Sequence, residues 1–60
     1  MKFLIVSILM QSATGLHTTE TRTLYETTKE CTQAKHEAAR HLEALNLTGA
    51  ILGFALECSS

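Results

Sequence analysis

The 60-residue sequence contains no proline and no tryptophan, and it has only three glycines and two cysteines. Because no stretch is rich in proline, glycine or serine, we predict no linker, low-complexity tract or repeat array, and one domain over residues 1–60. The formal net charge of -1 provides no basic surface for nucleic acid and does not favour a membrane surface as a partner. Hydrophobic residues make up 45% of the chain, which excludes a disordered protein.

The sequence also lacks the motifs that enzymes of known chemistry use. It has no glycine-rich phosphate loop, no HExxH motif and no GxSxG elbow, and chains of this size rarely form an enzyme pocket. Cys31, His36 and His41 are five residues apart, so on a helix each is rotated by about 140° from the last and the three cannot converge on a metal ion. We therefore predict no enzyme activity, no catalytic residue, no cofactor and no metal.

A helix is predicted from Thr27 to Leu45. Thr27 at the N-cap and Glu30 three residues later form a capping-box pattern, in which side chains satisfy backbone N–H groups of the first turn. Asn46 is expected to end the helix in a left-handed conformation. Apolar residues recur at helical spacing and form one packing stripe: Cys31, Ala34, Ala38, Leu42 and Leu45.

Three strands are predicted around this helix. Residues 1–10 are apolar except for Lys2 and Ser7, and residues 12–15 have the composition of a turn. Residues 16–25 alternate and are rich in threonine, which is typical of an edge strand. Residues 50–58 form the last strand, in which Cys58 shares a face with Leu52, Phe54 and Leu56.

The order of these elements predicts a small α+β fold of the ββαβ type. A hairpin places the first two strands side by side, and the most apolar strand fits best in the centre, which gives a mostly antiparallel three-stranded sheet with order 2-1-3. The helix covers one face of this sheet. Because the face that carries Cys58 should receive the helix stripe, we predict a disulfide between Cys31 and Cys58.

Residues 1–15 also permit a second interpretation. A basic residue, a short apolar run and the small residues at 13–15 fit a secretory signal peptide, whose removal would leave a βαβ module over residues 16–60. We favour the retained strand, because without it the two remaining strands lack a hydrophobic centre. Eight to ten apolar residues are too few to span a bilayer.

Several residues in this arrangement resemble those of small uncharacterised two-cysteine proteins encoded by tailed phages and their bacterial hosts. The matching residues are Tyr25, Thr27, Glu30, Cys31 and Cys58, and they follow an apolar segment over residues 1–10. The resemblance spans most of the chain. It implies a compact fold and a phage origin, and it carries no activity or site.

The predicted function is association, because one helix can cover only one face of the sheet. The opposite face should be apolar and should bind a second copy or another protein through Phe3, Ile5, Leu9, Ile51 and Ala55. A disulfide persists in oxidising surroundings, which favours a virion-associated or exported protein. The alternative is a secreted or periplasmic module without its signal peptide, and a thiol redox or metal-binding protein is less favoured, since Cys31 has no CxxC partner or placed base.

Overall fold

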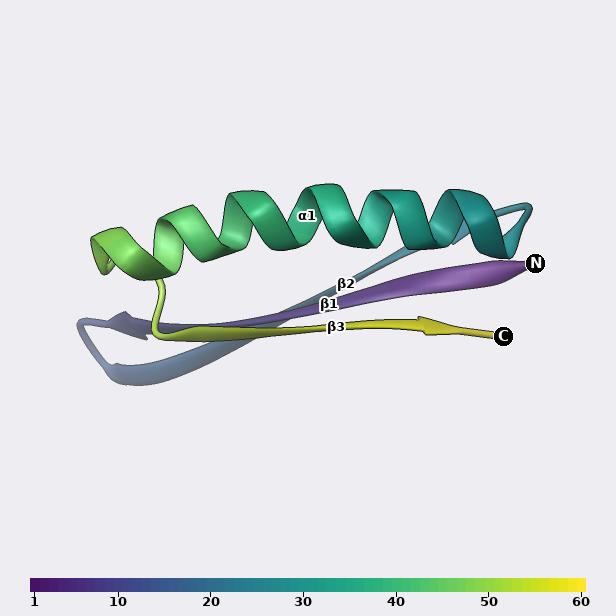
Figure 1. Cartoon of the computed structure of the whole chain (residues 1–60). Coiled ribbons are helices and arrows are strands. Elements are labelled where there is room, and N and C mark those ends of the chain that lie inside the picture. Colours follow the sequence, from purple (N-terminus) through teal and green to yellow (C-terminus); the bar gives the residue numbers. More distant parts are fainter.

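The computed structural model, which describes residues 1–60, confirms the predicted ββαβ order (Figure 1). The strands are β1 (Lys2–Ser12), β2 (Gly15–Tyr25) and β3 (Gly53–Ser59), and the helix is α1 (Thr28–Thr48). The three strands form one sheet, and α1 lies along one face of it, so the molecule has two layers (Figure 1).

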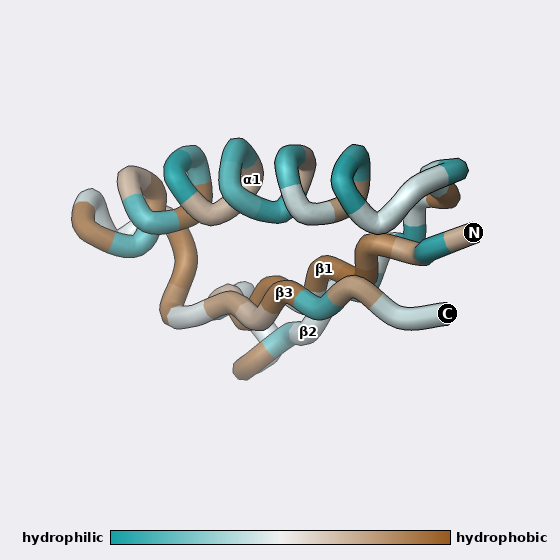
Figure 2. Tube along the Cα trace, turned by 45° about the vertical axis from the view of Figure 1, so that its right-hand side comes forward, coloured by the Kyte–Doolittle hydropathy of each residue, from teal (hydrophilic) through white to brown (hydrophobic).

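The sheet has the predicted order β2-β1-β3, with β1 antiparallel to both neighbours. Val6 in the middle of β1 pairs with Thr21 of β2 on one side and with Leu56 of β3 on the other. Figure 2 shows hydrophobic residues along β1 and in the segment that enters β3, whereas β2 is mostly hydrophilic. A strand that is apolar on both sides of its pleat belongs in the centre, because an edge position would leave more of that surface in water.

A tight turn joins β1 to β2. Ser12 pairs with Gly15, and Gly15 has a φ of 125°, a backbone conformation that residues with a Cβ atom rarely adopt. The Ser12 hydroxyl donates a hydrogen bond to the Gly15 carbonyl oxygen at 3.0 Å. Both strands therefore run to the turn itself, and β1 ends two residues later than the predicted strand.

The beginning of α1 matches its prediction. Thr27 is the N-cap in an extended conformation, and its hydroxyl oxygen accepts a hydrogen bond from the backbone N–H of Glu30 at 3.1 Å. The Glu30 carboxylate accepts from the Thr27 hydroxyl at 3.1 Å, where a full capping box would have it accept from the Thr27 backbone N–H. The Glu30 carboxylate also lies close to the positive end of the helix dipole.

The end of α1 corrects the prediction. The helix continues past Asn46 to Thr48, and Gly49 takes the left-handed conformation with a φ of 82°. The backbone N–H of Gly49 donates a hydrogen bond to the Asn46 carbonyl oxygen at 3.2 Å, and the N–H of Ala50 donates to the Leu45 carbonyl oxygen at 3.0 Å. These two bonds form a Schellman motif. The longer helix delays the last strand, so β3 begins at Gly53 and not at residue 50.

The core between α1 and the sheet is small. Only Leu4, Cys31, Leu42 and Ile51 are buried. The alanines of the helix stripe are partly exposed, and Leu45 at its end is 43% exposed. Each of the three buried aliphatic side chains stabilises the fold by roughly 2 kcal/mol. These few buried side chains stabilise the fold only weakly, so other contributions to stability are needed.

The molecule is long for its mass. Its Cα atoms span 38 × 20 × 10 Å, and their radius of gyration is 12.5 Å. A compact domain of this length has a radius of gyration of about 10 Å. The two long strands and the helix alongside them produce this shape, and the single helix covers only one face of the sheet (Figure 1).

Candidate functional site

The strand register identifies which side chains point away from the helix. Cys58 is bonded to Cys31 of α1, so Cys58 and its β1 partner Leu4 face the helix. Side chains alternate along a strand, and paired residues share a face. The other set of β1 residues and their partners on β2 and β3 therefore form the opposite side of the sheet, which we call the open face.

The open face is arranged in cross-strand rows, each with a residue of β2, β1 and β3 in that order. The first row contains Leu24, Phe3 and Ser59, and the second contains Arg22, Ile5 and Glu57. The remaining rows are Glu20, Ser7 and Ala55, then Thr18, Leu9 and Gly53, and finally Leu16 with Gln11. No helix covers this face, since α1 packs on the other side (Figure 1).

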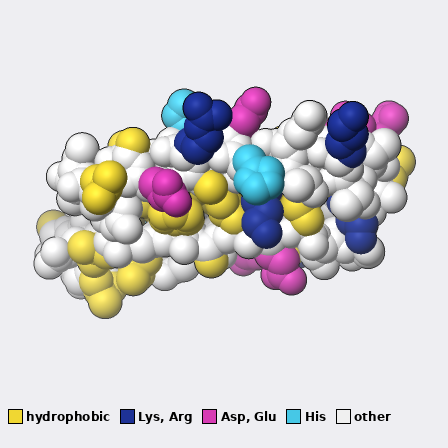
Figure 3. Space-filling model, viewed as in Figure 1, with side chains coloured by type: hydrophobic (Ala, Val, Ile, Leu, Met, Phe, Trp, Pro, Cys, Tyr) yellow, Lys and Arg dark blue, Asp and Glu magenta, His cyan; other side chains and the backbone are white.

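Hydrophobic side chains on the open face lie in water. Phe3 is 40% exposed, Leu24 beside it is 50% exposed, and Leu16 at the other end is 70% exposed. Ile5 and Leu9 between them are partly exposed. Figure 3 shows the molecule from the side, with charged side chains over α1 and hydrophobic side chains in the seam between α1 and the sheet. Exposed hydrophobic side chains like those of the open face mark sites of association in soluble proteins when they form a continuous patch.

The predicted interaction residues need one correction. Phe3, Ile5, Leu9 and Ala55 all lie on the open face. Ile51 does not belong to it, because it precedes β3 and is only 6% exposed, as part of the core. The prediction assumed that the strand began at residue 50, and alternation within such a strand would have turned Ile51 outward.

Two leucines of the open face were missed by the sequence reasoning. Leu16 and Leu24 lie on the same side of β2 as Glu20 and Arg22. The alternation in the sequence already placed these four residues together, but it did not show which side of β2 the helix would cover. Leu24 pairs with Phe3, which points away from the helix, so this side of β2 belongs to the open face.

Three charged residues lie on the open face, Glu20 and Arg22 on β2 and Glu57 on β3, so they flank the central strand β1. Arg22 contacts Glu20 on the same strand, with 3.4 Å between the guanidinium nitrogen and the carboxylate oxygen. Glu57 occupies the other side of Ile5 in the row that contains Arg22. Exposed ion pairs such as Glu20–Arg22 contribute little to stability. Arg22 lies beside Ile5 of β1, and Glu20 lies beside Ser7.

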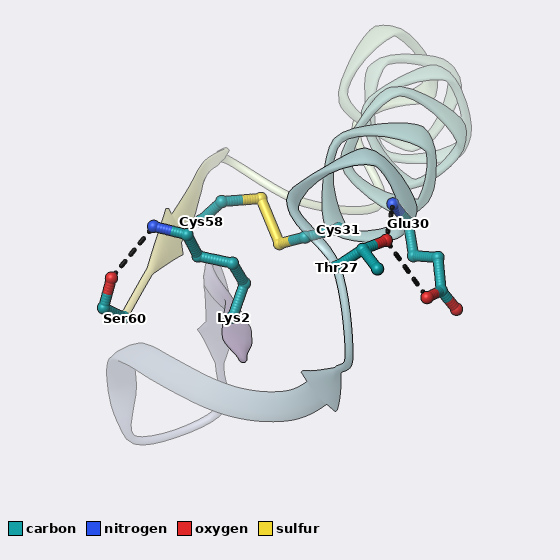
Figure 4. The surroundings of a disulfide bond; sticks show 6 residues. All are labelled: Lys2, Thr27, Glu30, Cys31, Cys58 and Ser60. Carbon is teal, nitrogen blue, oxygen red and sulfur yellow. Dashed lines mark hydrogen bonds between the residues drawn. A yellow bond between two sulfur atoms is a disulfide. The ribbon is translucent and has the colours of Figure 1, made fainter.

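The disulfide predicted between Cys31 and Cys58 is present (Figure 4). It joins the first turn of α1 to the end of β3, with 6.2 Å between the two Cα atoms. Cys31 is fully buried, and neither cysteine remains a free thiol. At the same end of the sheet, the Lys2 ammonium donates to the Ser60 hydroxyl at 2.9 Å, so the two chain ends lie together (Figure 4).

The other chemically active side chains are dispersed. No three histidine, cysteine or acidic residues lie close enough together to hold a metal ion. The one depression on the surface is lined by Glu37, Arg40, His41 and Ala44, which all project from α1. Since no second element contributes to it, this depression is a gap between neighbouring side chains of one helix.

Two further findings concern relationships and membranes. The helix α1 carries too many polar residues along its length to cross a lipid bilayer. Comparisons with protein-family models, with curated proteins and with solved structures find no match for this chain. The protein is therefore classified by its architecture alone. It is a disulfide-linked two-layer module whose sheet is covered on one face only.

Proposed function

We propose that the protein acts by association, as a small interaction or structural module without catalytic activity. The open face carries this proposal, because it presents Phe3, Ile5, Leu9, Leu16 and Leu24 to solvent on one side of the sheet. A partner that covered this face would remove apolar side chains from water, each with a gain of about 25 cal/mol per Å². The opposite surface, over α1, is charged and suits exposure to water (Figure 3).

The disulfide supports a proposal about location. Disulfides persist in oxidising compartments and on virion surfaces, and they are rare in the cytosol. We therefore place the module on a virion or in an exported state, in which the Cys31–Cys58 bond is retained. In the periplasm or outside the cell the same bond would stabilise an exported module.

The test of association compares two substitutions that each replace an aliphatic residue with glutamate. Ile5→Glu puts a charge in the centre of the open face, whereas Leu47→Glu alters a residue that is 88% exposed on α1. We expect the parent protein to bind a hydrophobic fluorescent dye or to associate in sedimentation, and Ile5→Glu to abolish both. Leu47→Glu should behave as the parent. A parent that stays monomeric, binds no dye and is unaffected by Ile5→Glu would contradict the proposal.

A further inference from the structure

We propose that the open face binds a second copy of this chain, face to face, about a two-fold axis that runs parallel to β1. This inference rests on the association proposed above and names its partner. Two copies would form a four-layer dimer, with the two sheets packed at the centre and one α1 helix on each outer side. Sheets that stack in this way lie about 10 Å apart and share one core.

The exposed area of the chain agrees with this partner. The solvent-accessible surface is 4421 Å², whereas a monomer of this mass exposes about 3,900 Å². The excess is about 500 Å² per chain, so two chains that each covered it would bury about 1,000 Å² in total. That total area reaches the lower limit for specific protein–protein interfaces, which is about 1,000 Å². The open face is also the part of the sheet that α1 leaves bare.

The charges on the open face define the orientation of the second copy. With the axis parallel to β1, each β1 lies over its equivalent, and β2 of one copy lies over β3 of the other. Arg22 then faces Glu57 of the second copy, and Glu57 faces Arg22 of the second copy, because these residues share the row of Ile5. Each contact therefore occurs twice, as two-fold symmetry requires.

An axis across the strands fits these charges less well. Through the row of Ile5 it would place Arg22 on Arg22 and Glu57 on Glu57, and through the row of Ser7 it would place Glu20 on Glu20. Midway between those rows it would place Arg22 over Glu20 of the second copy, but it would pack Ile5 against Ser7 of the second copy and leave Glu57 opposite Ala55 with no opposite charge. Like charges that face each other oppose binding at the first two positions, and the midway position loses the contact between the two Ile5 side chains and leaves Glu57 unpaired, so the parallel axis is preferred.

The twist of the sheets does not break the proposed ion pairs. Stacked sheets are rotated by about 30°, and neighbouring strands lie about 4.8 Å apart. At that distance from the axis the rotation displaces a facing residue by only about 2.5 Å, which an arginine side chain can span. Arg22 has donors enough to keep its contact with Glu20 at 3.4 Å and also reach Glu57 of the second copy.

Charge reversal tests this geometry in the full-length protein. Arg22→Glu and Glu57→Arg should each weaken the dimer at least about tenfold, because each reversal converts two attractive contacts into repulsive ones. The double variant with both reversals restores opposite charges across the axis and should recover most of the affinity. Arg40→Glu and Glu43→Arg on α1 are the matched controls and should leave it unchanged. The measurement is sedimentation equilibrium, in which monomers and dimers of a 6.6 kDa chain are resolved.

The outcomes separate this inference from the association on which it rests. A dimer that the single reversals weaken and the double reversal restores supports the proposed partner and geometry. A dimer whose affinity is the same in the parent and in all three charge-reversal variants overturns the proposed geometry. A monomer that binds dye or phosphatidylcholine vesicles through a face sensitive to Ile5→Glu overturns the second copy as partner, and it leaves association with lipid or another protein standing. A monomer that binds neither overturns both.

Discussion

At the scale of single residues, Gly49 shows how one position determines where an element stops. Its φ of 82° lies in the left-handed region, and its N–H group completes the hydrogen bonds at the end of α1. Asn46 was expected to take this role, because asparagine also tolerates that conformation. Glycine adopts it without a Cβ penalty, so the helix passes Asn46 and gains almost one further turn before it ends.

Gly49→Ala should therefore destabilise the protein by about 1 kcal/mol. No atom lies within 4 Å of a Cβ atom built at Gly49, so the cost arises from the backbone conformation and not from crowding. Gly53→Ala is the matched control, since its surroundings are equally open and its φ lies outside the strained region. Urea denaturation measures the difference, and equal stability of the two variants would contradict this account.

At the scale of elements, the attachment of α1 to β3 depends on one covalent bond and very few buried side chains. Cys31 and Cys58 are 27 residues apart, and they join the start of the helix to the end of the last strand. Closing a loop of about this length restricts the unfolded chain and contributes roughly 3.5 kcal/mol in the chain-entropy description. A domain of this size has a total stability of only about 3 to 9 kcal/mol. The disulfide is therefore a main contributor to the fold.

Reduction of the disulfide should lower the free energy of unfolding by roughly 3.5 kcal/mol. The loss is measured by urea denaturation, followed through the helical circular dichroism signal, with and without dithiothreitol. The double variant Cys31→Ala/Cys58→Ala is the control, because it has no bond to reduce and should ignore dithiothreitol. A parent protein whose midpoint is the same under both conditions would show that α1 is held by packing alone.

The helix and strands could largely be predicted from the sequence, whereas the residues at which they begin and end could not. The apolar run over residues 1–10, the Thr27 cap and the shared face of Cys58 were enough for the sheet order and the disulfide, and the structure confirms both. Element ends were less accurate, because both Asn46 and Gly49 can end a helix and only the packed structure selects one. That shift moved the start of β3, and with it Ile51 from the expected surface into the core.

At the scale of the whole molecule, the shape and the candidate site have the same origin. Two 11-residue strands and a 21-residue helix lie side by side, so the chain is long and thin and encloses only a small core. Part of the open face was visible in the sequence, since Phe3, Ile5 and Leu9 alternate along one strand. Leu16 and Leu24 could be assigned to it only once the hairpin register was known, because the geometry of the turn helps to set that register.

Dimer formation should make thermal stability depend on protein concentration. When unfolding also separates two chains, a tenfold increase in concentration stabilises the dimer by RT ln 10, which corresponds to a rise in Tm of about 5 °C for 120 residues in total. Ile5→Glu should remove this dependence, because it places two charges near the proposed axis, whereas Leu47→Glu should retain it. Circular dichroism melts over a hundredfold concentration range provide the measurement. A parent Tm that does not change over that range would mean that the folded chain needs no second copy for its stability.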